Sequence, residues 1–133
     1  RKRMGAWGIP RDGALLVDGS GLSRRNLMAP EAVYLVLKKA FVPAGTSPFV
    51  SGLPVAGVDG SLAARMKGTT TEGNLRAKTG TMSNIRSLAG YVTTRDGEHL
   101  ALVVIVNNYE GVGLDATESM DRMAVRLAEF TPK

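Results

Sequence analysis

Three stretches in the second half of the chain have the hydrophobic pattern of strands. Residues 74–79, 86–94 and 99–107 are short runs rich in apolar and β-branched side chains, separated by polar turns. The turn at 95–98 contains Asp96-Gly97, a pair that readily adopts the backbone angles of a tight hairpin. Because the connections are short, we expect an antiparallel meander. The third run is apolar from Leu100 to Val106, so both faces of that strand should be covered.

Two helical patterns flank these strands. The first begins at Pro30 and should end at Pro43 and Gly45. The second begins with Asp115 as a predicted N-cap and Glu118 three residues later. Each has one apolar face, formed by Val33, Val36, Leu37, Ala40 and Phe41 in the first helix and by Ala116, Met120, Met123, Ala124, Leu127 and Ala128 in the second. We expect both faces to pack on the sheet, and for the methionine-bearing second face we prefer this to an open binding groove.

The rest of the chain is rich in turn-forming residues. The first twenty residues are predicted to be loop and then a short strand at 14–17, followed by a polar, tightly turning loop from Asp18 to Asn26. That loop could present Ser and Arg donors, or it could be a strand-to-helix connection whose Asp and Ser bond their own backbone. Residues 44–73 should hold only short helical stretches, at 49–53 and 61–66. The predicted fold is therefore an α+β-like α/β fold, an antiparallel sheet flanked by helices.

Composition narrows the possible functions. The chain has 133 residues and a mass of 14.1 kDa, which suits one domain or a piece of a larger one. No apolar run is long enough to cross a membrane. The net charge of +5 would suit nucleic acid or a cell-wall polymer. The basic residues are scattered and aromatic residues are few, so we do not expect nucleic-acid binding.

Several kinds of chemistry are disfavoured by the residue types present. The sequence has no Cys and a single His, His99, which lies beside a turn and should be a solvated flanking residue. Zinc sites and cysteine catalysis are therefore not expected, and no serine is nominated as a partner for His99 in a Ser-His-Asp triad. No phosphate-binding glycine loop is present. We predict neither a metal nor a cofactor.

The strongest candidate chemistry is Lys78-Thr79-Gly80, at the end of the first predicted strand. A lysine and a threonine hydroxyl side by side can hold a carboxylate, one by charge and one by a hydrogen bond. Glycine leaves room for a peptide to lie against the strand edge. The same tripeptide is a signature of the penicillin-recognising serine enzymes. On its own it is also compatible with a strand end that carries an exposed lysine.

Two further blocks make the match more specific. Asp18 to Asn26, Leu53 to Ser61 and Ala77 to Thr81 together resemble the D-alanyl-D-alanine carboxypeptidase/endopeptidase group, the low-molecular-mass class C penicillin-binding proteins. The resemblance covers nearly the whole chain, including Leu88 to Tyr91 and the closing helix. It implies the transpeptidase-like fold of penicillin-binding proteins and β-lactamases. It also implies a serine acyl-enzyme mechanism on peptidoglycan stem peptides, acylation by β-lactams, and a periplasmic or other extracytoplasmic location.

Two motifs of that group are missing here. None of the eight serines has Lys three residues later or Asn two residues later. The nucleophile of Ser-x-x-Lys and the Ser-x-Asn element are therefore absent from residues 1–133. The resemblance implies that these residues are the C-terminal part of the D,D-peptidase domain. It also implies that the N-terminal part of the same protein is a partner and that this chain alone is inactive.

The resemblance assigns roles only to matching positions. Lys78 and Thr79 would hold the substrate carboxylate, Gly80 would permit close approach, and the backbone N–H of Thr81 would donate to the oxyanion. Five further residues would line the pocket for the substrate's diamino-acid side chain: Leu22, Ser23, Arg24, Met82 and Ser83. Two alternatives remain open at this point, a non-catalytic peptidoglycan-binding module and a fragment of a related β-lactamase or esterase.

Overall fold

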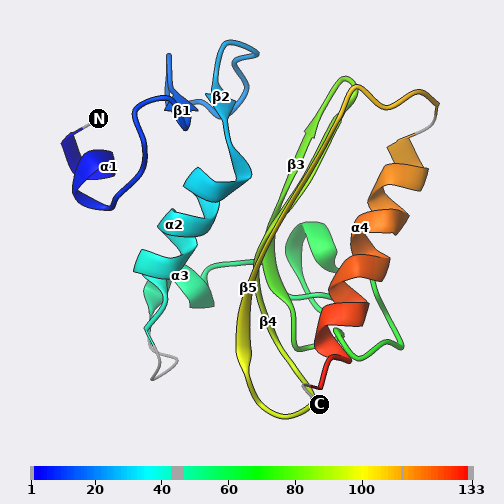
Figure 1. Cartoon of the computed structure of the whole chain (residues 1–133). Helices are drawn as coiled ribbons and strands as arrows, with labels where there is room; N and C mark the ends of the chain where they lie inside the picture. Colours follow the sequence, from blue (N-terminus) through cyan, green and yellow to red (C-terminus); the bar gives the residue numbers. More distant parts are fainter. Residues whose placement is uncertain (1, 43–46, 112, 132–133) are drawn as a thin grey trace.

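The computed structural model of the chain describes residues 2–42, 47–111 and 113–131 (Figure 1). A three-stranded sheet lies between a helix on each face, and a small two-stranded hairpin precedes the first of these helices. The elements in chain order are α1 (Lys2–Ala6), β1 (Ala14–Leu15), β2 (Leu27–Met28), α2 (Pro30–Ala40), α3 (Pro48–Ser51), η1 (Gly60–Leu62), β3 (Arg76–Met82), β4 (Ile85–Thr93), β5 (His99–Asn107) and α4 (Gly113–Ala128).

The large sheet is the predicted antiparallel meander, with strand order β3-β4-β5. Its first strand begins at Arg76 instead of residue 74 and continues to Met82. Asn74 lies outside the strand because its side-chain amide replaces the backbone pairing. The amide donates to the Thr93 carbonyl at 2.8 Å and accepts from the Thr93 N–H at 2.9 Å. Two residues, Ser83 and Asn84, then close the tight turn into β4.

One face of the sheet packs against α4. The core on this side contains fully buried Leu62, Leu75, Leu88 and Met120. The predicted apolar stripe of α4 is wrong at one position, since Met123 is exposed. Four residues of the stripe are buried, namely Ala116, Met120, Ala124 and Ala128. These residues are spaced four apart, so they form a narrower line than the prediction allowed and leave Met123 on the solvent side.

The beginning of α4 also differs from the prediction. The helix starts at Gly113, so Asp115 lies within its first turn and is not the N-cap. An acidic side chain there still faces the positive end of the helix dipole.

The other face of the sheet packs against α2. This helix buries Ala32 and Leu37, and the Tyr91 hydroxyl of β4 donates to the Leu37 carbonyl at 2.7 Å. Both helices contact β5, α2 from one face of the sheet and α4 from the other, as the prediction of a strand covered on both sides requires (Figure 1). Coverage is partial, since Leu102 is buried and the rest of the apolar run is half-buried. The residues predicted to end the helix, Pro43 and Gly45, lie outside the described residues.

The N-terminal region differs most from the prediction. Residues 2–6 form a short helix, and β1 pairs with β2 in a hairpin. The loop from Asp18 to Asn26 therefore joins two strands and is not a strand-to-helix connection. Within the described part of residues 44–73, the helical pieces are short, as predicted.

Candidate functional site

One edge of β3 is open where the Lys-Thr-Gly sequence lies. The Ala77 N–H donates to the Pro54 carbonyl at 2.9 Å, so chain from the preceding loop covers the start of this edge. Backbone groups alternate along a strand, which places the N–H groups of Thr79 and Thr81 on the same outer edge as that of Ala77. Within the described residues, no strand pairs with this edge beyond Ala77. An extended peptide could pair there.

Lys78 supplies a positive charge at the open edge. Its side chain is exposed, and its Nζ donates to the Thr79 carbonyl at 2.6 Å. The ion pairs in the described part of the chain are Arg65–Asp121, Arg122–Glu118 and Arg126–Glu129, so none of them neutralises Lys78. Among the described residues, the hydrogen bond found for its ammonium group is to this neutral carbonyl, which leaves the charge available to an anion.

Thr79 lies on the opposite face of β3 from Lys78, next to the turn η1. Its Oγ1 donates to the Oγ of Ser61 at 3.0 Å. To bind a substrate carboxylate, as expected, the Thr79 hydroxyl must be reachable from the strand edge. In the structure its hydrogen-bond partner is the Ser61 hydroxyl. Ser61 ends the block from Leu53 that resembles the family, and the resemblance assigns it no role. A serine at the end of a tight Asp-Gly turn was the available signal.

Gly80 has a structural role that the sequence did not reveal. It is paired with Ser87 of β4, and a Cβ atom at Gly80 would lie 2.2 Å from the Ser87 Oγ. The missing side chain therefore makes room for a neighbouring strand. This is separate from the expected close approach of a substrate at the strand edge.

The turn after β3 is stabilised by the side chain of Arg86, for which the sequence predicts no role. The Arg86 guanidinium donates to the carbonyls of Met82 and Ile85, each at 2.9 Å, and it lies 5.6 Å from the centre of the Tyr109 ring. Two backbone bonds to one planar cation hold the two-residue turn closed. Ser83, in that turn, is exposed.

The loop from Asp18 to Asn26 is organised around its own side chains. The Asp18 carboxylate accepts from the Ser20 hydroxyl at 2.8 Å, the Ser20 N–H at 3.1 Å and the Asn26 amide at 3.2 Å. These bonds, those from Ser20 first, hold the pKa of Asp18 below its ordinary value of 3.8, and desolvation opposes them slightly. Leu22 is 74% exposed and Arg24 is exposed, while Ser23 is half-buried.

The structure does not join this loop to the end of β3. The β1–β2 hairpin and the β3–β4 turn both stand at the upper end of Figure 1. No hydrogen bond or ion pair found between described residues connects Leu22, Ser23 or Arg24 to Met82 or Ser83. Their predicted shared pocket therefore stays a prediction.

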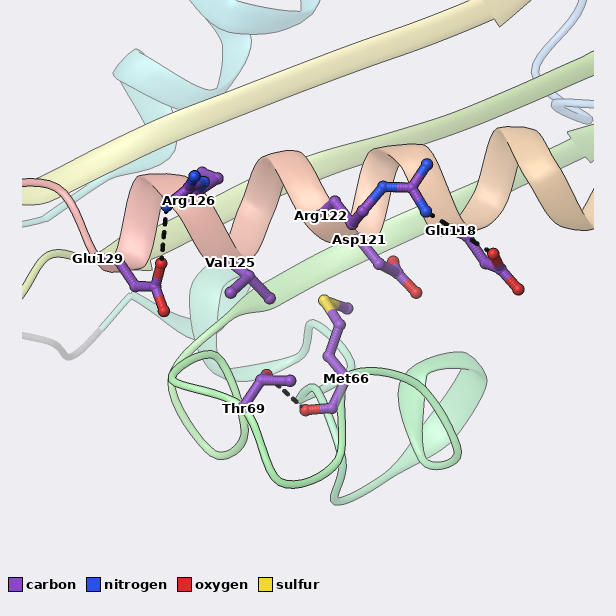
Figure 2. Close-up of a pocket in the computed structure, with 8 residues that line it drawn as sticks. All are labelled: Met66, Thr69, Glu118, Asp121, Arg122, Val125, Arg126 and Glu129. Carbon is purple, nitrogen blue, oxygen red and sulfur yellow. Dashed lines mark hydrogen bonds and ion pairs between the residues drawn. The ribbon is translucent and has the colours of Figure 1, made fainter.

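Two hollows of the structure are lined by residues outside β3. One, of about 650 Å³, is lined by residues between Met4 and Leu15. The other, of about 460 Å³, separates the outer side of α4 from the chain at 66–69 (Figure 2). Its rim is charged, but Arg122 pairs with Glu118 and Arg126 with Glu129. Neither of these two hollows includes Lys78, whose side chain is exposed at the edge of β3.

The described residues hold neither a metal-binding cluster nor a membrane-spanning helix. No group of three or more His, Cys, Asp or Glu side chains there could hold a metal ion. No described helix combines the length and the apolar character needed to cross a membrane.

Known proteins similar to this chain are D-Ala-D-Ala carboxypeptidases. Residues 1–130 match the model of the D-Ala-D-Ala carboxypeptidase 3 (S13) family. The chain is 43% identical over 128 residues to a D-alanyl-D-alanine carboxypeptidase of Actinomadura sp. strain R39, covering 92% of this chain and 23% of that protein. It is 35% identical over 111 residues to the D-alanyl-D-alanine carboxypeptidase DacB of Haemophilus influenzae, covering 82% of this chain and 23% of that protein.

The fold agrees as well. The crystal structure of Haemophilus influenzae penicillin-binding protein 4 in complex with a β-lactam matches with a TM-score of 0.86 and 28% identity, over 97% of this chain and 32% of that one. This chain thus spans about a quarter of the length of the curated relatives it matches. Because the family model extends over nearly every residue and the fold agrees, the chain belongs to the D-Ala-D-Ala carboxypeptidase 3 (S13) family.

Proposed function

We propose that this chain is the C-terminal part, residues 1–133, of the peptidase domain of a serine D-alanyl-D-alanine carboxypeptidase/endopeptidase. Its role is to supply the strand that binds the C-terminal carboxylate of peptidoglycan stem peptides. The observation that carries the proposal is the open edge of β3, where the Lys78 ammonium, in none of the ion pairs of the described residues, and the Thr79 hydroxyl lie on the two faces of the strand. Substrates and β-lactams both carry a carboxylate that this pair would hold.

The proposed reaction divides its groups between this chain and the rest of the protein. A serine hydroxyl outside residues 1–133 attacks the carbonyl carbon of the penultimate D-Ala and forms the acyl-enzyme as the terminal D-Ala leaves. The outward N–H of Thr81 donates to the oxyanion that develops on that carbonyl. Water then attacks the ester and releases the shortened peptide. A β-lactam would acylate the same serine by opening its ring.

Three observations support this assignment. The N–H groups of Thr79 and Thr81 share one edge, as pairing with an extended substrate requires. The relative with 28% identity was crystallised with a β-lactam. Leu22, Ser23 and Arg24 are at least partly exposed, so they could line a side-chain pocket with Met82 and Ser83.

The proposed substrate also implies a location. Because peptidoglycan lies outside the cytoplasm, the full-length protein would work in the periplasm or another extracytoplasmic compartment.

The test measures acylation of the full-length protein by a fluorescent penicillin. We expect Lys78→Ala to slow labelling by about 10- to 100-fold, because a charge-assisted hydrogen bond of about 1.5–3 kcal/mol is lost. Lys38→Ala removes an exposed lysine from α2 and should leave labelling unchanged. Labelling that is equally fast without Lys78 would remove it from the site.

The isolated chain provides a second test. Residues 1–133 alone should not be labelled covalently, since the nucleophile is proposed to lie outside them. Stoichiometric labelling would contradict the assignment of the serine. Tight binding of the isolated chain to cell-wall sacculi, unaffected by Lys78→Ala, would instead favour a peptidoglycan-binding module that uses the net charge of +5.

A further inference from the structure

Ser61 is held in place by the loop that precedes it. Within that loop the Val55 N–H donates to the Asp59 carboxylate at 2.7 Å, and the Gly57 N–H donates to the Leu62 carbonyl at 3.0 Å. Leu62, the next residue after Ser61, is fully buried in the core. The serine backbone is therefore anchored on both sides, although its side chain is exposed.

The turn before Ser61 depends on glycine. Gly60 has a φ of +53°, in the left-handed region, and a Cβ atom there would lie 3.1 Å from the ring of Pro54. Pro54 in turn accepts from the N–H of Ala77 in β3. The same loop that covers the beginning of the strand edge thus places Ser61 where that edge becomes open.

The direction of the Thr79–Ser61 hydrogen bond decides what the Thr79 hydroxyl can offer to an anion. A hydroxyl has one hydrogen to donate, and Thr79 gives its hydrogen to the Ser61 oxygen at 3.0 Å. In this arrangement Thr79 has none left for a carboxylate. If Ser61 rotates and donates to the Thr79 oxygen, the Thr79 hydrogen is released toward the strand edge. An oxygen that accepts a hydrogen bond also becomes a stronger donor.

We propose that Ser61 is a positioning residue for carboxylate binding, acting through the Thr79 hydroxyl. When a substrate or β-lactam carboxylate binds at the edge of β3, Ser61 donates to the Thr79 Oγ1 and Thr79 donates to the carboxylate. Lys78 approaches the same anion from the other face of the strand. This inference rests on the proposed function, and it adds a third side chain to the carboxylate site.

The experiment compares two substrates in the full-length protein. One is an acyl-D-Ala-D-Ala peptide, and the other is the same peptide with its terminal carboxylate capped as a methyl ester. Release of the C-terminal residue is followed for both. We expect Ser61→Ala to lower kcat/KM for the free carboxylate by about five- to tenfold, the loss of one neutral hydrogen bond, with most of the change in KM. The methyl ester should change by less than about twofold.

Two control variants separate positioning from folding. Ser61→Thr keeps the hydroxyl and should restore kcat/KM for the free carboxylate to within about twofold of the original protein. Ser119→Ala removes a half-buried serine hydroxyl of α4 that accepts from Arg122, and it should change kcat/KM for neither substrate. Should Ser61→Ala fold poorly, Ser61→Cys keeps a similar volume with only weak hydrogen bonding and takes its place in the comparison.

The possible outcomes are distinct. An equal loss for both substrates would mean that Ser61 supports only the loop, and an unchanged kcat/KM would mean that it does not act on Thr79. Either result overturns the inference. Lys78→Ala, measured alongside, keeps the two proposals apart. If Lys78→Ala has no effect the proposed function fails, whereas a large effect of Lys78→Ala with no effect of Ser61→Ala refutes the inference alone.

Discussion

Replacing Gly80 by alanine tests whether this glycine serves the sheet or the substrate. The Cβ of Gly80→Ala would lie 2.2 Å from the Oγ of Ser87 and 3.6 Å from the Ser87 Cβ. The second distance is an ordinary contact, whereas the first is more than 1 Å shorter than the roughly 3.5 Å at which heavy atoms attract best. The whole conflict is therefore with one hydroxyl oxygen, and Ser87→Ala removes that oxygen.

The magnitude follows from two opposing effects. Overpacking of this kind costs about 1–3 kcal/mol, while replacing glycine by alanine inside a strand recovers about 0.5–1 kcal/mol. We expect Gly80→Ala alone to lower the free energy of unfolding by about 1–2 kcal/mol. In the Ser87→Ala background only the gain remains, so the same change should raise the free energy of unfolding by about 0.5–1 kcal/mol. The coupling between the two sites then equals the overpacking cost, about 1–3 kcal/mol.

The assay is urea unfolding of the four proteins in this double-mutant cycle. Gly90→Ala is the matched control, because its Cβ would lie 2.0 Å from the Arg76 carbonyl oxygen and 2.5 Å from the Ala77 Cα. Those are backbone atoms that cannot rotate away, so we expect a loss of about 3 kcal/mol or more with no rescue by Ser87→Ala. A coupling energy near zero between positions 80 and 87 would refute the reasoning.

The same double variant also addresses function. If Gly80 matters only for room beside Ser87, the full-length protein with Gly80→Ala and Ser87→Ala should be acylated by penicillin at the rate of Ser87→Ala alone. If Gly80 is needed for close approach of the substrate, acylation should stay slow after stability has been restored.

Two further predictions concern the elements around the sheet. Tyr91→Phe should lower the free energy of unfolding by about 1 kcal/mol, because the Leu37 carbonyl loses one of its donors; Tyr34→Phe on the exposed side of α2 is the control, and an equal effect of both would contradict the role of that bond. The pKa of Asp18 is lowered, so its stabilising bonds are present above pH 3.8 and are lost as the pH falls through the lowered pKa. The NMR shift of the Ser20 amide, which donates to Asp18, should therefore titrate with a midpoint below 3.8. It should not titrate in Asp18→Asn. A midpoint at or above 3.8 would contradict this second prediction.

Local patterns were sufficient for the main elements of the fold. The apolar run from Leu100 to Val106, the Asp96-Gly97 turn and the spacing of apolar residues after Pro30 each depend on neighbours in the sequence, and each prediction is confirmed. The errors arose where distant residues decide. Asn74 leaves the strand because Thr93 binds its side chain, and Met123 is exposed because the sheet meets only a narrow line of α4.

The sequence by itself determined the residue types of the candidate site, since a lysine, a threonine and a glycine in a row carry their charge, donor and missing side chain into any fold. Tertiary structure decided which of their atoms are available. Strand β4 pairs with the inner edge of β3, and the loop at Pro54 covers the outer edge as far as Ala77, so the outer edge is open beyond that residue among the described residues. Only the turn η1 brings Ser61, eighteen positions away, to the Thr79 hydroxyl. The physical reason is that hydrogen bonds are local in space, whereas a sequence pattern records only what is local along the chain.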